Sequence, residues 1–105
     1  MGAWQQVCRS AELLPGEFRC VDVEDVAVAV YNIDGNFYAI EDVCTHDGGD
    51  LAGGAIEGFA VECLRHGAKF DLRTGAALCA PAHVPTAVME VKNEHDMLWV
   101  RDPRW

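Results

Sequence analysis

With 105 residues, half of them hydrophobic, the chain is long enough for a modest core, and we expect residues 1–105 to form a single domain. No apolar run approaches the roughly 18 residues that span a bilayer, and the first residues do not read as a secretory signal, so we expect a cytoplasmic protein. The net charge of −9 excludes binding to nucleic acid or to an anionic membrane by charge attraction. Twelve acids and two bases lie in residues 1–62, and they either steer the chain toward a basic partner or only keep it soluble.

Short apolar or alternating segments, separated by turn residues, follow one another along the first part of the chain. No window has a convincing helical period, so we expect an all-β protein. Val26–Tyr31 is apolar on both faces, which is typical of a central strand. Asp34-Gly35-Asn36 then predicts a hairpin turn. The strands predicted in this part of the chain are Trp4–Cys8, Phe18–Val23, Val26–Tyr31 and Phe37–Glu41.

The middle of the chain predicts two short hairpins within a small subdomain of about residues 42–79. Gly58 is the bend of the first hairpin and Thr74-Gly75 is the bend of the second. We interpret Gly53-Gly54 as ordinary loop glycines. Two further strands should return to the main sheets. The segments predicted here are Ala55–Glu57, Phe59–Glu62, Phe70–Leu72, Ala76–Leu78, Thr86–Lys92 and Met97–Arg101.

Two short Cys/His pairs lie within this subdomain, Cys44-Thr45-His46 and Cys63-Leu64-Arg65-His66, separated by sixteen residues. Thiolate and imidazole are the donors of zinc sites and of iron–sulfur sites. Zinc fingers usually place two cysteines before two histidines, but here the order is Cys, His, Cys, His. The interleaved order favours two irons, with both cysteines on one iron and both histidines on the other, as in a Rieske 2Fe–2S cluster. A single zinc ion on the same four residues is the alternative.

The residues around these pairs carry a family resemblance. Gly48-Gly49 follows the first pair, and Gly67-Ala68-Lys69-Phe70-Asp71 follows the second. With these motifs the chain resembles the small Rieske-type ferredoxins of multicomponent aromatic-ring-hydroxylating dioxygenases, such as the biphenyl and carbazole dioxygenase ferredoxins. The resemblance extends over nearly the whole chain. It implies a Rieske fold, in which an antiparallel β-sandwich base carries a small cluster-binding subdomain, and one Rieske-type 2Fe–2S cluster. The implied ligands are Cys44, His46, Cys63 and His66.

The resemblance also implies a function. A ferredoxin of this kind takes single electrons from an NAD(P)H-dependent, flavin-containing ferredoxin reductase and passes them to a terminal Rieske oxygenase. It is not itself an enzyme, because the mononuclear iron of an oxygenase needs two histidines and a carboxylate. Only His83 and His95 remain, and we expect both at the surface. The alternatives are a small Rieske-like subunit of an assimilatory nitrite reductase and a zinc-binding interaction module.

Roles for residues around the ligands follow from the same resemblance. Pro81 lies where Rieske proteins carry a loop that covers the cluster, and His46 and His66 would form the tip that docks on a partner. Ala68 and Phe70 stand where high-potential Rieske proteins have serine and tyrosine hydroxyl groups. Their absence implies a cluster of low potential.

Two further expectations concern the charged residues near the ligands and the remaining cysteines. Acids of the first loop and bases of the second give the tip a mixed charge, which either orients a partner or is only a set of solvated loop charges. The members of this mixed-charge tip are Asp42, Asp47, Asp50, Arg65, Lys69 and Arg73. No disulfide should join the loops, because Gly49 and Arg65 stand where the high-potential relatives have cysteines. Cys8, Cys20 and Cys79 are an odd set, which suits a reducing compartment, and each is interpreted as a small buried hydrophobic residue.

Overall fold

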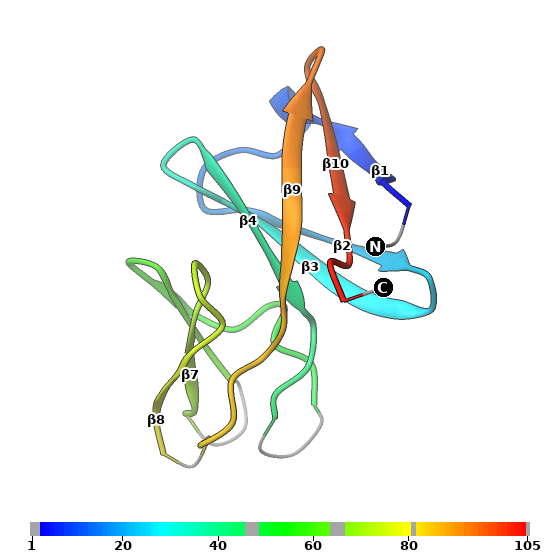
Figure 1. Ribbon diagram of the computed structural model, residues 1–105. Coiled ribbons are helices and arrows are strands. Elements are labelled where there is room, and N and C mark those ends of the chain that lie inside the picture. The colour runs from blue at the N-terminus through cyan, green and yellow to red at the C-terminus, as the bar shows by residue number, and fades with distance from the viewer. Residues whose placement is uncertain (1–2, 46–48, 64–66, 81, 105) are drawn as a thin grey trace.

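The computed structural model describes residues 3–45, 49–63, 67–80 and 82–104 (Figure 1). In these residues every strand pairing is antiparallel. The helical structure there is the short 3-10 turn η1 (Ser10–Glu12), and no helix is long and apolar enough to cross a membrane. The all-β prediction is confirmed. The strands are β1 (Gln5–Arg9), β2 (Phe18–Val23), β3 (Val26–Ile33), β4 (Asn36–Glu41), β5 (Ile56–Glu57), β6 (Ala60–Glu62), β7 (Lys69–Asp71), β8 (Ala77–Cys79), β9 (Val88–Glu94) and β10 (Met97–Arg101).

The larger part of the molecule, here called the base, is a six-stranded sheet in the order β1-β10-β9-β4-β3-β2. Strands β4 and β9 pair through Ala39 with Met89 and Ile40 with Val88, and the sheet divides there into two three-stranded layers. Figure 1 shows β9 and β10 running across the direction of β3 and β4. The two layers enclose the base core, which confirms the sandwich. The base core contains Cys8, Leu13, Val23, Val28, Val30, Ala39, Met89, Leu98 and Val100.

Strand β3 lies between two cores, which accounts for its sequence. Val28 and Val30 face the base core, whereas Tyr31 and Ile33 belong to a second buried group. Successive side chains of a strand point to opposite faces, so a strand between two cores must be apolar on both. The central position predicted for Val26–Tyr31 is confirmed, and the strand continues for two more residues.

Three hairpins of the base are closed by two-residue turns in which both residues have positive φ. The turns are Glu24–Asp25 (49° and 69°), Asp34–Gly35 (53° and 90°) and His95–Asp96 (55° and 63°). Two consecutive residues of positive φ form the type I′ turn, whose twist matches that of the paired strands. Among the three, the turn at Asp34–Gly35 carries the glycine that marks such turns in a sequence. Because the last turn lies at His95–Asp96, β9 extends to Glu94 rather than ending at Lys92.

The smaller part, here called the subdomain, contains a four-stranded sheet in the order β5-β6-β7-β8. Both predicted hairpins are present, with positive φ at Gly58 and Gly75. The strands are two or three residues long, and their buried side chains pack with residues of β3 and β4 of the base. We call this second buried group the junction core. It contains Ala29, Tyr31, Ile33, Ile40, Cys44, Leu51, Val61, Cys63, Ala68, Phe70, Leu72 and Ala82.

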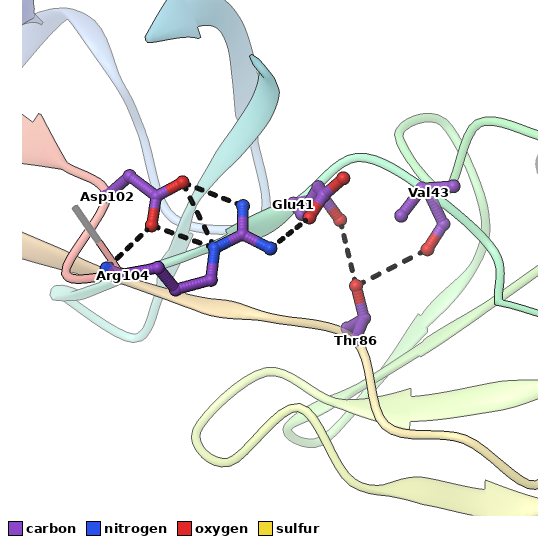
Figure 2. A network of polar contacts seen from close by, with 5 residues as sticks. All are labelled: Glu41, Val43, Thr86, Asp102 and Arg104. Atoms are coloured by element: carbon purple, nitrogen blue, oxygen red, sulfur yellow. Dashed lines mark hydrogen bonds and ion pairs between the residues drawn. The ribbon is translucent and has the colours of Figure 1, made fainter. Parts of the chain in front are cut away.

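A polar network braces the place where the chain passes between the base and the subdomain (Figure 2). The Arg104 guanidinium forms ion pairs with the buried Asp102 (Nη2–Oδ2, 2.7 Å) and with Glu41 (Nη1–Oε1, 3.0 Å). The Thr86 hydroxyl lies 3.2 Å from the carbonyl oxygen of Glu41 and 3.4 Å from that of Val43, and shares its proton between them. Hydrogen bonds to Asp102 raise the pKa of Arg104. The C-terminal segment therefore supports the end of β4, where the subdomain begins.

Candidate metal centre

Cys44 begins the first cysteine loop, residues 44–49, three residues after the end of β4. The residue is fully buried, and its backbone N–H donates a hydrogen bond to the carbonyl oxygen of Gly49 (2.7 Å). This bond closes a six-residue loop with the thiol at its base. His46, the expected partner ligand, lies outside the described residues.

The second cysteine loop, residues 63–68, repeats this arrangement directly after β6. Cys63 is 2% exposed, and its N–H donates to the carbonyl oxygen of Ala68 (2.6 Å), again five residues ahead. Gly67 has a φ of 75°, which favours glycine, and its N–H donates to the carbonyl oxygen of Cys63 (3.2 Å). His66 lies outside the described residues. Each cysteine therefore stands at the base of a loop closed in the same way, and both belong to the junction core.

The chain after β8 is attached to both cysteine loops. The Thr45 hydroxyl donates to the carbonyl oxygen of Val84 (2.5 Å), and the Cys79 thiol donates to that of Gly67 (3.5 Å). Pro81, expected to cover the cluster, lies outside the described residues. The described ends of the two cysteine loops and the chain after β8 lie at the same end of the molecule (Figure 1). The two cysteines and the chain after β8 thus form one site.

Asp42 does not belong to the expected mixed-charge tip. It is 9% exposed, because its Oδ1 accepts hydrogen bonds from the backbone N–H groups of Leu51 (2.7 Å) and Ala52 (2.8 Å). The expectation for this residue is wrong, since its carboxylate is buried and accepts hydrogen bonds from backbone N–H groups. Asp47 and Arg65, two other members of the expected tip, lie outside the described residues.

Arg73 does not lie at the expected mixed-charge tip either. It follows β7 and so lies at the opposite end of that strand from the second cysteine loop. There it pairs with Asp71 (Nη2–Oδ2, 3.0 Å), and its guanidinium lies 4.2 Å from the centre of the Phe59 ring. The hydrogen bond from Arg73 lowers the pKa of Asp71. Lys69, within β7, pairs with Glu57 of β5 (3.8 Å).

The remaining cysteines and histidines follow the expectations in part. Cys8 is buried in the base core, as expected. The expectation is wrong for Cys20 and Cys79, which are exposed. Cys20 alternates with Val21 and Val23, which face the base core, and so it points to the opposite face of β2. None of these three cysteines forms a disulfide. His83 and His95 are exposed, as expected.

The described residues of the site fit an iron–sulfur cluster. Two thiols buried in one apolar core are soft ligands shielded from solvent, which suits iron and sulfide. Ala68 and Phe70 are fully buried in the same core and offer no hydroxyl group. Sequence reasoning missed Thr45 and the backbone role of Asp42. Neither contact leaves a signal in the sequence, because the groups that these residues contact are backbone atoms distant in sequence.

Comparison with known proteins identifies the family. The profile of the Rieske [2Fe-2S] domain matches residues 3–93. The chain belongs to the Rieske [2Fe-2S] domain family. This Rieske chain is 37% identical over 98 residues to the ferredoxin CarAc of Metapseudomonas resinovorans, a match that covers 92% of each protein. It is 39% identical over 94 residues to the ferredoxin component of biphenyl 2,3-dioxygenase from Rhodococcus jostii, covering 90% of this chain and 88% of the relative.

Solved structures agree with the sequence relatives. A chain in the complex of reduced oxygenase and oxidised ferredoxin of carbazole 1,9a-dioxygenase superposes with a TM-score of 0.91 at 35% identity, covering 97% of this Rieske chain and 95% of that chain. The ferredoxin of carbazole 1,9a-dioxygenase from Nocardioides aromaticivorans superposes with a TM-score of 0.90 at 28% identity, covering 94% and 97%. The Rieske fold, with its antiparallel base and small subdomain, is therefore confirmed.

Proposed function

We propose that this chain is a Rieske 2Fe–2S ferredoxin that carries single electrons to a terminal aromatic-ring-hydroxylating oxygenase. The observation that carries the proposal is the pair of cysteine loops, closed by equivalent backbone bonds and buried in one core. The relatives described above support it, since they are ferredoxin components and match this chain over about nine tenths of their length. The chain acts as an electron-transfer component and not as an enzyme.

The proposed ligands are Cys44 and Cys63 on one iron and His46 and His66 on the other. Each histidine lies, in sequence, inside the loop that its cysteine begins. The backbone bonds that close the loops fix the chain on either side of each Cys/His pair. When bound, the cluster supplies a one-electron redox centre. The ring nitrogen that each histidine does not use for iron is then available to a partner.

The proposed electron acceptor is a Rieske oxygenase, because a similar solved structure contains a ferredoxin together with its oxygenase. The proposed donor is an NAD(P)H-dependent, flavin-containing reductase, since flavins convert hydride transfer into single-electron steps. Leu78 and Val84 are 51% and 59% exposed beside the cysteine loops and offer a partner apolar contact. We place the protein in the cytoplasm, where reducing conditions keep the exposed Cys20 and Cys79 as thiols.

A spectroscopic and kinetic experiment tests this function. Protein purified anaerobically should contain iron and sulfide and should give a Rieske electron paramagnetic resonance (EPR) signal after reduction with dithionite. The reduced protein should be reoxidised when it is mixed with the terminal oxygenase of an aromatic-ring dioxygenase system in a stopped-flow instrument. His66→Ala should abolish the Rieske signal, whereas His83→Ala, at an exposed position, should retain it.

Three outcomes would contradict separate parts of the proposal. A colourless protein with bound zinc would exclude the cluster. A His66→Ala variant with the wild-type signal would exclude the ligand assignment. A fully loaded protein that the oxygenase leaves reduced would exclude the proposed acceptor.

A further inference from the structure

Asp42 is a buried carboxylate outside the proposed ligand set, and it lies two residues before Cys44. Its Oδ1 accepts hydrogen bonds from the backbone N–H groups of Leu51 (2.7 Å) and Ala52 (2.8 Å). Its own backbone N–H donates to the carbonyl oxygen of Ala27 in β3 (2.8 Å). One residue therefore joins the base sheet to the chain that enters the first cysteine loop and to the chain that leaves it.

The chain that leaves the first loop is in turn placed against the second. The Gly54 N–H donates to the carbonyl oxygen of Leu51 (3.1 Å), and a Cβ at Gly54 would overlap the carbonyl oxygen of Glu62. The Glu62 N–H donates to the carbonyl oxygen of Ala55 (2.9 Å), and Cys63 follows directly. The interpretation of Gly54 as an ordinary loop glycine is wrong, because a side chain there would push the loops apart. A continuous series of backbone contacts joins the two cysteine loops.

Asp42 also brings a negative charge to the edge of the junction core. Its Oδ2 lies 3.9 Å from Sγ of Cys20. Burial raises the pKa of the Tyr31 hydroxyl and of the Cys20 thiol, and the charge of Asp42 raises both further, with a smaller contribution from Asp50 at Cys20. Tyr31 and Cys44 both belong to the junction core, so the charge of Asp42 acts on the core that contains the first cysteine. Charges interact more strongly in such an interior than in water.

We propose that Asp42 is a positioning residue that holds the two cysteine loops at the spacing the cluster needs, and that its charge keeps the cluster at low potential. The inference rests on the cluster of the proposed function. Reduction adds one electron to the cluster, and a fixed negative charge nearby disfavours it. The carboxylate supplies an acceptor oxygen and a charge, and substitution separates them: asparagine keeps the oxygen and loses the charge, whereas alanine loses both.

The test compares Asp42→Asn and Asp42→Ala with Asp50→Asn, which removes the same charge from an exposed residue that directly follows the first cysteine loop. Asp42→Asn should keep its iron and its EPR signal. At a fixed potential its ratio of reduced to oxidised protein should rise about tenfold, an upward midpoint shift of about 59 mV in protein-film voltammetry. Asp42→Ala should lose iron to a competing chelator about 10–100-fold more readily. Asp50→Asn should keep its iron and show a smaller midpoint shift, because solvent screens the charge of an exposed carboxylate.

Each expected result has a contrary outcome. Iron retention in Asp42→Ala equal to that of the wild type would overturn the positioning role. A midpoint in Asp42→Asn equal to that of Asp50→Asn would overturn the role of the charge. If Asp42→Ala fails to fold, iron retention in Asp42→Asn still tests the positioning role. A loss of iron in that variant would show that an acceptor oxygen at this position does not hold the two loops. A wild-type protein without a Rieske signal overturns the proposed function together with this inference, whereas normal wild-type protein and unresponsive variants overturn this inference alone.

Discussion

The base and the subdomain are stabilised in different ways. Strands of the base are five to eight residues long and are joined in part by two-residue turns, so backbone pairing between neighbours specifies most of its structure. Strands of the subdomain are two or three residues long, and its loops depend on single contacts such as the Asp42 carboxylate and the close approach of Gly54 to Glu62. Local strand and turn signals therefore account for most of the base, whereas the loops of the subdomain also depend on contacts between residues distant in sequence.

The two cores provide the strongest test of this difference. Leu98 is fully buried in the base core and Leu72 is fully buried in the junction core. Either leucine changed to alanine should lower the free energy of unfolding by about 2–5 kcal/mol. In the iron-loaded protein, Leu98→Ala should reduce hydrogen-exchange protection throughout, whereas Leu72→Ala should reduce it mainly in β6, β7 and β8. Uniform loss of protection in both variants would show that the two parts open as one unit.

Hydroxyl groups added inside the junction core should change the redox potential without changing the fold. Phe70→Tyr and Ala68→Ser place donors where high-potential relatives have them, and a donor stabilises the reduced cluster more than the oxidised one. At roughly 1.5 kcal/mol per charge-assisted bond, each substitution should raise the midpoint by on the order of 50–100 mV. Phe37→Tyr, in the base, is the matched control and should leave the midpoint unchanged. Protein-film voltammetry measures all three, and an unchanged midpoint in both junction-core variants would contradict the prediction.

Exposed apolar residues on the two parts should differ in their effect on electron transfer. Val84→Asp, beside the cysteine loops, should slow oxidation by the oxygenase about tenfold, a loss of about 1.4 kcal/mol that one displaced apolar contact can account for. Leu14→Asp introduces the same charge on the base, at a residue that is 57% exposed. Its oxidation rate should equal that of the wild type. Equal stopped-flow rates in the two variants would show that Val84 does not contact the oxygenase.

The smallest expected effect concerns pH. Arg73 lowers the pKa of Asp71 below its ordinary value of 3.8, so the pair stabilises the fold above that pH and loses its effect as the pH falls through the lowered pKa. In Arg73→Gln the pKa of Asp71 should return toward 3.8 and acid unfolding should begin at a slightly higher pH. Carbon-13 NMR titration of the Asp71 carboxyl group measures the shift. Lys92→Gln, which removes a surface ion pair of the base, should leave the titration of Asp71 unchanged.

Much of this protein could be predicted from its sequence, for reasons that differ between the two parts. Both ends of β2 agree with the predicted segment, because an alternating segment and its flanking turns are local signals. The spacing of the Cys/His pairs predicts Cys44 and Cys63 as ligands, and the structure buries both cysteines in the junction core. The burial of Asp42 and the remote position of Arg73 were not found, since a sequence shows a charge but not the atom that it contacts. The exposure of Cys20 and Cys79 was missed because the burial of a strand residue depends on which face it points to and on what covers that face, and the covering elements are distant in sequence.

One consequence of the junction between the two parts concerns how such a protein can diversify. The N–H of Glu41 donates to the carbonyl oxygen of Ala87, and the Thr86 hydroxyl donates to Glu41, so the chain departs from the base and returns to it at one point. Because β4 and β9 are antiparallel neighbours, everything between them is a single insertion in an otherwise ordinary hairpin. Connections between adjacent strands tolerate changes of length and composition. The subdomain can therefore change during evolution while the base keeps its strand order.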